Sequence, residues 1–154
     1  RAQAPRVVVL SIPVLPATPP MGAAARAELL AQARDVATTP WVPTKDAAGQ
    51  TASGDVVWSP SVQRGFMRFV GLAPNDPAKT QYQLWIFDRA RDQLYPVDGG
   101  VFNVPSTGEI VVPITPRVTV SDPNLFAITV EPPGGVVVSK RERIVVTATP
   151  SPRG

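Results

Sequence analysis

The fold is decided by the stretch QYQLWIFD, which occupies residues 81–88. Successive side chains of a β-strand point to opposite faces of its sheet. Leu84 and Ile86 therefore share one face, and Trp85 and Phe87 share the other. Because both faces are apolar, we expect this strand to lie inside a sheet and to be covered on both sides. The helix described below is the cover that we expect for the second face.

Beyond this stretch, the chain after Gly54 is a series of short strand-like runs separated by clusters of Gly, Pro, Asn and Asp. This rhythm is typical of a sandwich or barrel, because parallel βαβ units would need a helical pattern between the strands. We predict a mainly β fold, a β-sandwich-like (Ig-like) antiparallel domain with one N-terminal helix packed on it. The predicted strands span residues 55–58, 65–70, 81–88, 101–104, 109–114, 126–131 and 143–149.

Glycine and proline mark the predicted ends of these strands. We expect turns at Asp98-Gly99-Gly100 and at Thr107-Gly108, where residues can take positive φ. A strand should end abruptly at Pro132-Pro133-Gly134-Gly135, where prolines fix φ and glycines open it. Pro113 cannot donate a ladder hydrogen bond, so the run that contains it should be an edge strand.

One helical stretch precedes the strands. Leu29, Ala33 and Val36 fall at helical spacing, and Thr18 can cap the helix. We predict a helix over residues 21–39, which ends before Pro40, and a surface loop over residues 41–54.

A length of 154 residues indicates one domain. We assign residues 1–20 to an N-terminal arm or strand and residues 21–154 to the β-rich domain with its leading helix. The apolar run at residues 7–15 is too short to cross a bilayer, which takes about 20 residues. Because the chain begins at Arg1, we expect it to be a piece of a longer protein or a processed product.

The composition excludes several kinds of chemistry. The chain has no histidine and no cysteine, which excludes thiol nucleophiles, disulfides, imidazole metal sites and Ser-His-Asp triads. The formal net charge is +3, and the densest basic run is Lys140-Arg141-Glu142-Arg143. This run is sparser than the roughly 4–8 clustered bases of lipid or nucleic-acid patches, so we expect a solvated turn or strand edge. We predict no catalysis, no cofactor, no metal and no nucleic-acid partner.

Three carboxylates bracket the segment after the central strand: Asp88, Asp92 and Asp98. They could bind calcium or act as an acid and base pair. However, Ala90 stands where the EF-hand pattern requires a second oxygen ligand, and the flanking arginines supply neutralising partners. We therefore expect an exposed hairpin tip, with a cation site and catalysis as the alternatives.

Other patterns resemble sites only in composition. Ser139 and Lys140 are adjacent, so on a strand they point to opposite faces and cannot pair as nucleophile and base. The glycine pairs 99–100 and 134–135 do not fit the phosphate-binding pattern G-x-x-x-x-G-K-[ST]. Three tryptophans could line a ligand groove, but large aromatic residues in a domain of this size are usually core; they are Trp41, Trp58 and Trp85.

The order of several motifs is similar to one family. The motifs are Gly54-Asp55-Val56-Val57-Trp58-Ser59-Pro60, Gly71-Leu72, Tyr82-Gln83-Leu84-Trp85, Gly100-Val101-Phe102 and Ile128-Thr129-Val130-Glu131-Pro132-Pro133-Gly134-Gly135. This series resembles the C-terminal domain of the anti-sigma-K factor (RskA) family over residues 50–149. The sequence departs from the family pattern at residues 136–141, where VVVSKR replaces a Pro-Thr-Gly-like turn.

The resemblance implies a regulatory role. Family members are single-pass membrane proteins, in which a cytoplasmic segment, often a zinc-binding one, holds an extracytoplasmic-function sigma factor away from RNA polymerase. A transmembrane helix joins that segment to a β-rich domain on the extracytoplasmic (periplasmic) face, and stepwise proteolysis frees the sigma factor. This chain would be the outer domain, without the sigma-binding segment and the anchor. Its expected partner is a regulating membrane protease or a signal protein, and the motifs carry over no catalytic, cofactor-binding or metal-binding residue.

Two alternatives remain open from the residues. A secreted adhesion or carbohydrate-binding module would place its tryptophans on an exposed platform, whereas the regulatory interpretation predicts buried tryptophans. A carboxylate hydrolase would need two acids, such as Asp88 and Asp98, about 5–9.5 Å apart in a cleft. The surfaces that we expect to make contacts are the edge strand near Pro113 and the loop over residues 41–54.

Overall fold

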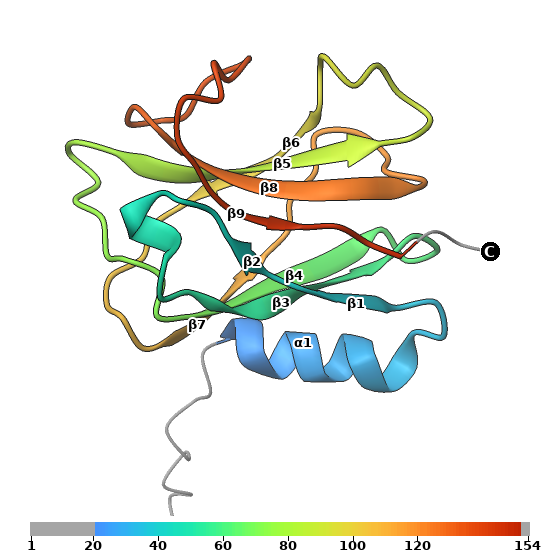
Figure 1. The fold of residues 1–154 in the computed structure, drawn as a ribbon. Helices are drawn as coiled ribbons and strands as arrows, with labels where there is room; N and C mark the ends of the chain where they lie inside the picture. The colour runs from blue at the N-terminus through green and yellow to red at the C-terminus, as the bar shows by residue number, and fades with distance from the viewer. Residues whose placement is uncertain (1–20, 152–154) are drawn as a thin grey trace, which may run out of the picture.

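The computed structural model describes residues 21–151 and shows two antiparallel sheets packed face to face within them (Figure 1). The four-stranded sheet has the order β1-β3-β4-β7 and the five-stranded sheet the order β2-β9-β8-β5-β6. The predicted sandwich is therefore confirmed, while the predicted arm at residues 1–20 lies outside the described residues. The first sheet is built from β1 (Ala37–Pro40), β3 (Ser53–Ser59), β4 (Arg64–Val70) and β7 (Glu109–Pro113), and the second from β2 (Val42–Pro43), β5 (Gln81–Asp88), β6 (Val97–Phe102), β8 (Pro123–Glu131) and β9 (Ile144–Ala148).

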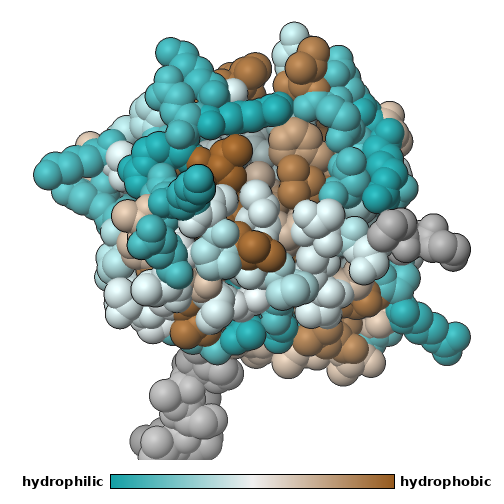
Figure 2. Space-filling model, viewed as in Figure 1, coloured by the Kyte–Doolittle hydropathy of each residue, from teal (hydrophilic) through white to brown (hydrophobic). Residues whose placement is uncertain are grey.

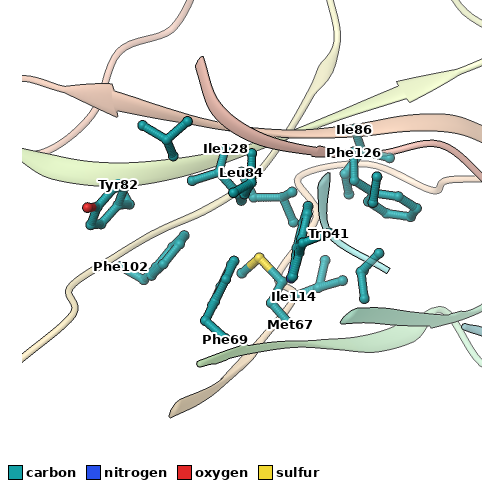
Figure 3. Close-up of a cluster of buried hydrophobic side chains, with 14 of the residues drawn as sticks. Trp41, Met67, Phe69, Tyr82, Leu84, Ile86, Phe102, Ile114, Phe126 and Ile128 are labelled. Carbon is teal, nitrogen blue, oxygen red and sulfur yellow. The ribbon is translucent and has the colours of Figure 1, made fainter. Parts of the chain in front are cut away.

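The core lies between the sheets and is built from inward-facing side chains of both (Figure 3). A row of stacked rings crosses it, with ring centroids 5.1 Å apart for Trp41 and Phe69, 5.5 Å for Phe69 and Phe102, and 5.6 Å for Phe102 and Tyr82. Phe69 comes from β4, whereas Phe102 and Tyr82 come from β6 and β5. The stack therefore joins the two sheets, and each such pair adds about 0.5–1.5 kcal/mol beyond the area that it buries.

The helix α1 (Met21–Gln32) covers the outer face of the four-stranded sheet (Figure 1). Leu29 packs against Val57 of β3 and Phe66 of β4. At Gly22 the helix backbone approaches β7 so closely that a Cβ would lie 2.5 Å from the carbonyl oxygen of Val111. Within residues 21–151, no helix combines the length and the apolar character that crossing a membrane requires.

The central strand β5 lies between β8 and β6, as predicted, but its second cover is not the helix. Trp85 and Phe87 face away from the core and form a separate cluster with Ala127. Val136, from the connection between β8 and β9, packs against this cluster. The expectation that the helix covers β5 was wrong, because α1 covers the other sheet and the chain after β8 returns over β5.

The helix is also shorter than predicted, since it ends at Gln32, and residues 37–40 form β1 instead. The β-branched Thr38 and Thr39 pair with Val57 and Val56 of β3, which a helical continuation could not do. The residues predicted as a surface loop, 41–54, are likewise structured. They contain β2, the 3₁₀ turn η1 (Ala47–Gly49) and the beginning of β3.

Two glycine-rich segments differ in their outcome. The segment Asp98-Gly99-Gly100 is not a turn but lies inside β6, where the register with β5 shifts by one residue. Gly134 and Gly135, with φ of 89° and 75°, follow the end of β8 as predicted. The strand β7, which contains Pro113, lies at an edge of its sheet, also as predicted.

Candidate functional site

The three candidate carboxylates are not brought together. Asp88 is buried rather than exposed at a hairpin tip, and it accepts hydrogen bonds from the backbone N–H groups of Ala90, Ser121 and Asp122 at 3.0, 2.8 and 3.2 Å. Asp92 accepts from the N–H of Leu94 at 2.9 Å. Within residues 21–151, no three acidic side chains are placed so that they could hold a metal ion. The carboxylate of Asp88 therefore holds loops in place.

Asp98 lies in a groove of about 790 Å³ beside β6. Its carboxylate accepts from the N–H of Gly100 at 2.9 Å and lies 3.6 Å from the guanidinium of Arg117. Asp98 is the one carboxylate among the residues that line this groove. The paired acids in a cleft that a carboxylate hydrolase requires are not present there.

The tryptophans are all core residues, with at most 5% of each exposed. Trp41 donates from Nε1 to the carbonyl oxygen of Arg68 at 3.2 Å, and Trp85 donates to Oγ1 of Thr129 at 2.9 Å. Trp58 is equally buried, and its Nε1 has no partner among the described residues. This burial agrees with the regulatory interpretation and leaves a carbohydrate-binding module without the tryptophan platform that it predicts.

The two surfaces expected to make contacts are mostly engaged within the domain. The edge strand β7 has one face under α1. In the segment 41–54, Thr44 donates to the carbonyl oxygen of Ile144 at 2.6 Å, and Asp46 pairs with Arg143 at 2.8 Å. The hydrogen bonds from Arg143 lower the pKa of Asp46, and Asp46 raises the pKa of Arg143. This segment is thus fastened to the beginning of β9.

A different surface stands out, formed by residues 89–96 before β6 and residues 132–143 after β8. We call it the loop face. Leu94 is 68% exposed and Val137 is 92% exposed, and Tyr95 and Val138 beside them are also exposed. In the space-filling view, apolar surface bordered by hydrophilic residues gathers near the top, where these two connections lie in Figure 1 (Figure 2).

The loop face is held by the side chain of Gln83, which projects from the outer side of β5. Gln83 donates from Nε2 to the carbonyl oxygen of Val136 and accepts at Oε1 from the Val136 N–H, both at 3.0 Å. The side chain is buried, with 1% of it exposed. Both polar groups of one residue in the loop are therefore fixed by one amide.

A chain of hydrogen bonds fixes the next part of the loop. Trp85 donates to Thr129, and the Oγ1 of Thr129 donates to Oε2 of Glu131 at 2.6 Å. The same carboxylate oxygen accepts from Oγ of Ser139 at 2.5 Å. Ser139 is therefore bound to Glu131 and does not pair with Lys140.

Arg141 links the two halves of the loop face. Its backbone is left-handed, with φ of 57°. Its guanidinium lies 4.9 Å from the ring centroid of Phe87 and donates to the carbonyl oxygens of Gln93 and Leu94 at 3.2 and 3.4 Å. Through this cation–π contact and these hydrogen bonds, the Arg141 side chain joins the two connections.

The loop face was not predicted from the sequence. Residues 136–138 are three valines directly after a Pro-Pro-Gly-Gly turn, and this apolar run outside a predicted strand was the available signal. The departure from the family pattern at residues 136–141 falls on the same segment.

The comparisons with known proteins agree with the motifs. The chain matches the family model described as "Anti-sigma-K factor rskA, C-terminal" over residues 4–144. This match includes α1 and begins well before residue 50, where the resemblance read from the motifs began. Neither the curated proteins nor the solved structures gave a match. Because this family model covers most of the chain, the chain belongs to the anti-sigma-K factor RskA C-terminal family.

Proposed function

We propose that this chain is the extracytoplasmic sensory domain of a membrane-anchored anti-sigma factor and that it regulates an extracytoplasmic-function sigma factor. The observation that carries the proposal is the family match over residues 4–144, since anti-sigma factors are regulatory proteins. The sigma factor itself would be held by a segment outside this chain.

The contacts of the polar side chains support a role in recognition. Asp88, Glu131 and Ser139 could have taken part in chemistry, but each holds a loop through its hydrogen bonds. The loop face is one surface that the domain presents outward, with four exposed large apolar side chains. Rigid scaffolds that position exposed loops are a common architecture for binding.

In this proposal the folded domain shields the adjoining chain from a regulating membrane protease. A signal protein that binds the domain, or any event that unfolds it, would change the access of the protease. Regulation would then depend on the stability of the sandwich and on the contacts of its surface, and not on a reaction within it.

The location is tested in the full-length protein by fusing reporter enzymes after residue 151. Alkaline phosphatase folds to an active enzyme outside the cytoplasm, and β-galactosidase is active inside it. We expect activity from the alkaline phosphatase fusion only. The reverse pattern would contradict an extracytoplasmic domain.

The shielding role is tested with a destabilised core. Phe69 is fully buried in the aromatic stack, and a Phe→Ala change in a core costs about 3–5 kcal/mol. In the full-length protein, Phe69→Ala should raise transcription from a sigma-dependent reporter at least severalfold. Val62→Ser, at a half-exposed position in the turn between β3 and β4, is the matched control and should leave transcription unchanged. Unchanged transcription with an unfolded domain would contradict shielding.

A further inference from the structure

The loop face carries a cluster of exposed apolar side chains from two connections that are far apart in the sequence. Leu94 and Tyr95 precede β6, and Val137 and Val138 follow β8. All four border one small hollow of about 30 Å³. The cluster is therefore contiguous.

These side chains are held outward by the fold. The backbone of Val136 is bound at both polar groups by Gln83, and Arg141 joins the second connection to the carbonyl oxygens of the first. The exposure of Val137 is thus a fixed property of the folded domain. Exposed contiguous apolar surface of this kind, bordered by polar residues, marks protein or membrane contact.

Positive charge gathers around the cluster. Residues 21–151 contain twelve basic and twelve acidic residues, whereas segments 89–95 and 137–143 together contain five basic and two acidic ones. Arg89 and Arg143 are paired with Asp122 and Asp46, which lie outside these segments. Among the described residues, the other three bases have no carboxylate within ion-pair distance; they are Arg91, Lys140 and Arg141, and the two acids are Asp92 and Glu142.

The projection of the apolar side chains and the charge around them favour a bilayer over a protein partner. Val137 projects almost completely into solvent, and the hollow that it shares with Leu94 and Tyr95 holds about 30 Å³. Two wider grooves also border this segment: Val137 lines the groove of about 790 Å³ beside Asp98, and Val138 lines one of about 400 Å³. A stable protein interface needs roughly 800 Å² of complementary surface on each partner. Projecting aliphatic tips bordered by cations instead fit a lipid surface, which has no shape of its own to match and attracts basic residues when its lipids are anionic.

We propose that the loop face docks on an anionic lipid bilayer. Leu94, Val137 and Val138 enter the headgroup region, Tyr95 lies at the interface, and Lys140 contacts lipid phosphates. The basic run at residues 140–143 is too sparse to do this alone, and the fold adds the aliphatic tips and a second basic segment. This proposal gives the loop face of the proposed sensory domain a binding partner. It rests on the proposed function only for the location of the domain in the cell.

The test is flotation of the 154-residue chain with vesicles of equal parts phosphatidylglycerol and phosphatidylcholine. We expect weak partitioning, with half of the chain bound at a lipid concentration on the order of 1 mM, since even a myristoyl chain gives only marginal binding. Pure phosphatidylcholine vesicles and high salt should lower the bound fraction. Because this test uses the isolated chain, a failure to bind vesicles would not change the outcome of the topology and reporter experiments, which use the full-length protein.

Matched variants identify the surface responsible. The double change Leu94→Ser and Val137→Ser should lower the partition coefficient by about tenfold or more, and Lys140→Glu by at least about fivefold. The first control is Val62→Ser, at another exposed apolar position. The second is Arg34→Glu, at a residue between α1 and β1, on the side of the other sheet. Both variants should bind as the unchanged chain does.

Three outcomes would overturn the proposal. They are no flotation with anionic vesicles, equal loss of binding in the control variants, and self-association in light scattering that Val137→Ser abolishes without any vesicle binding. The last would assign the loop face to a second copy of the chain.

Discussion

The buried side chain of Gln83 holds the connection after β8 in place over the outer side of β5. It lies on the outer side of β5, where a solvent-exposed sheet would allow any polar residue, yet it is buried under the connection after β8. Its amide matches the N–H and the C=O of Val136, so a loop segment without regular structure has both polar groups satisfied. Buried backbone groups require such partners, and the loop can cover β5 for this reason.

Gln83→Ala should lower the free energy of unfolding by about 1–3 kcal/mol, because two buried backbone groups lose their partner. Urea denaturation followed by tryptophan fluorescence measures this. Gln50→Ala, where an exposed amide donates one long hydrogen bond of 3.4 Å, should change stability by less than about 0.5 kcal/mol. Equal effects of the two changes would contradict the role of Gln83.

Asp35 makes stability depend on pH. Hydrogen bonds from Ser59 and from the backbone and side chain of Ser61 lower its pKa from 3.8 to about 2. Because the folded-state pKa is lower than the unfolded one, the contribution is fully present above about pH 4 and is lost as the pH falls toward about 2. Asp35→Asn should therefore flatten the dependence of the urea midpoint on pH in this window. A variant with the same dependence as the parent would show that other carboxylates are responsible.

At the level of elements, α1 and β1 show where local pattern and long-range pairing compete. The helical spacing continues past Gln32, but Thr38 and Thr39 gain a ladder with β3, and Asp35 fixes the turn between the two elements. Salt bridges reinforce the position of α1, since Arg26 pairs with Asp55 at 2.8 Å. The helix thus covers the four-stranded sheet, and β1, the strand that follows the helix in the chain, extends that same sheet at its edge.

Leu29→Ala should destabilise the domain by about 2–3 kcal/mol, because Leu29 is the buried residue through which α1 contacts β3 and β4. Leu30→Ala, one position along the same helix and 40% exposed, is the matched control and should cost under about 1 kcal/mol. Thermal unfolding followed by circular dichroism distinguishes them. Similar losses for both would show that α1 does not pack by this face.

At the level of the whole molecule, the sandwich is closed by an aromatic stack between the sheets and covered by different elements on its two outer faces. The helix covers one sheet, and the loop face covers part of the other (Figure 1). The exposed apolar side chains of the loop face consequently lie on the side of the sandwich away from α1 (Figure 1).

Iodide should quench the tryptophan fluorescence of the folded chain far less than that of a free tryptophan derivative, because all three indoles are buried. Unfolding in urea should restore full quenching and serves as the control. Strong quenching of the folded chain would place an indole on the surface and would favour a ligand platform.

The sequence by itself determined most of the strands, the two-sheet class and the family. Period-two patterns and turn residues are local, and the bounds of β5 and the edge position of β7 followed from them. The end of α1, the strand status of residues 37–40 and 97–100, and the cover of β5 were not predictable, because pairing between distant segments decides them. The loop face belongs to the same group. Leu94 and Val137 are 43 positions apart in the sequence, and only the packing of two connections over one sheet brings them to a common surface.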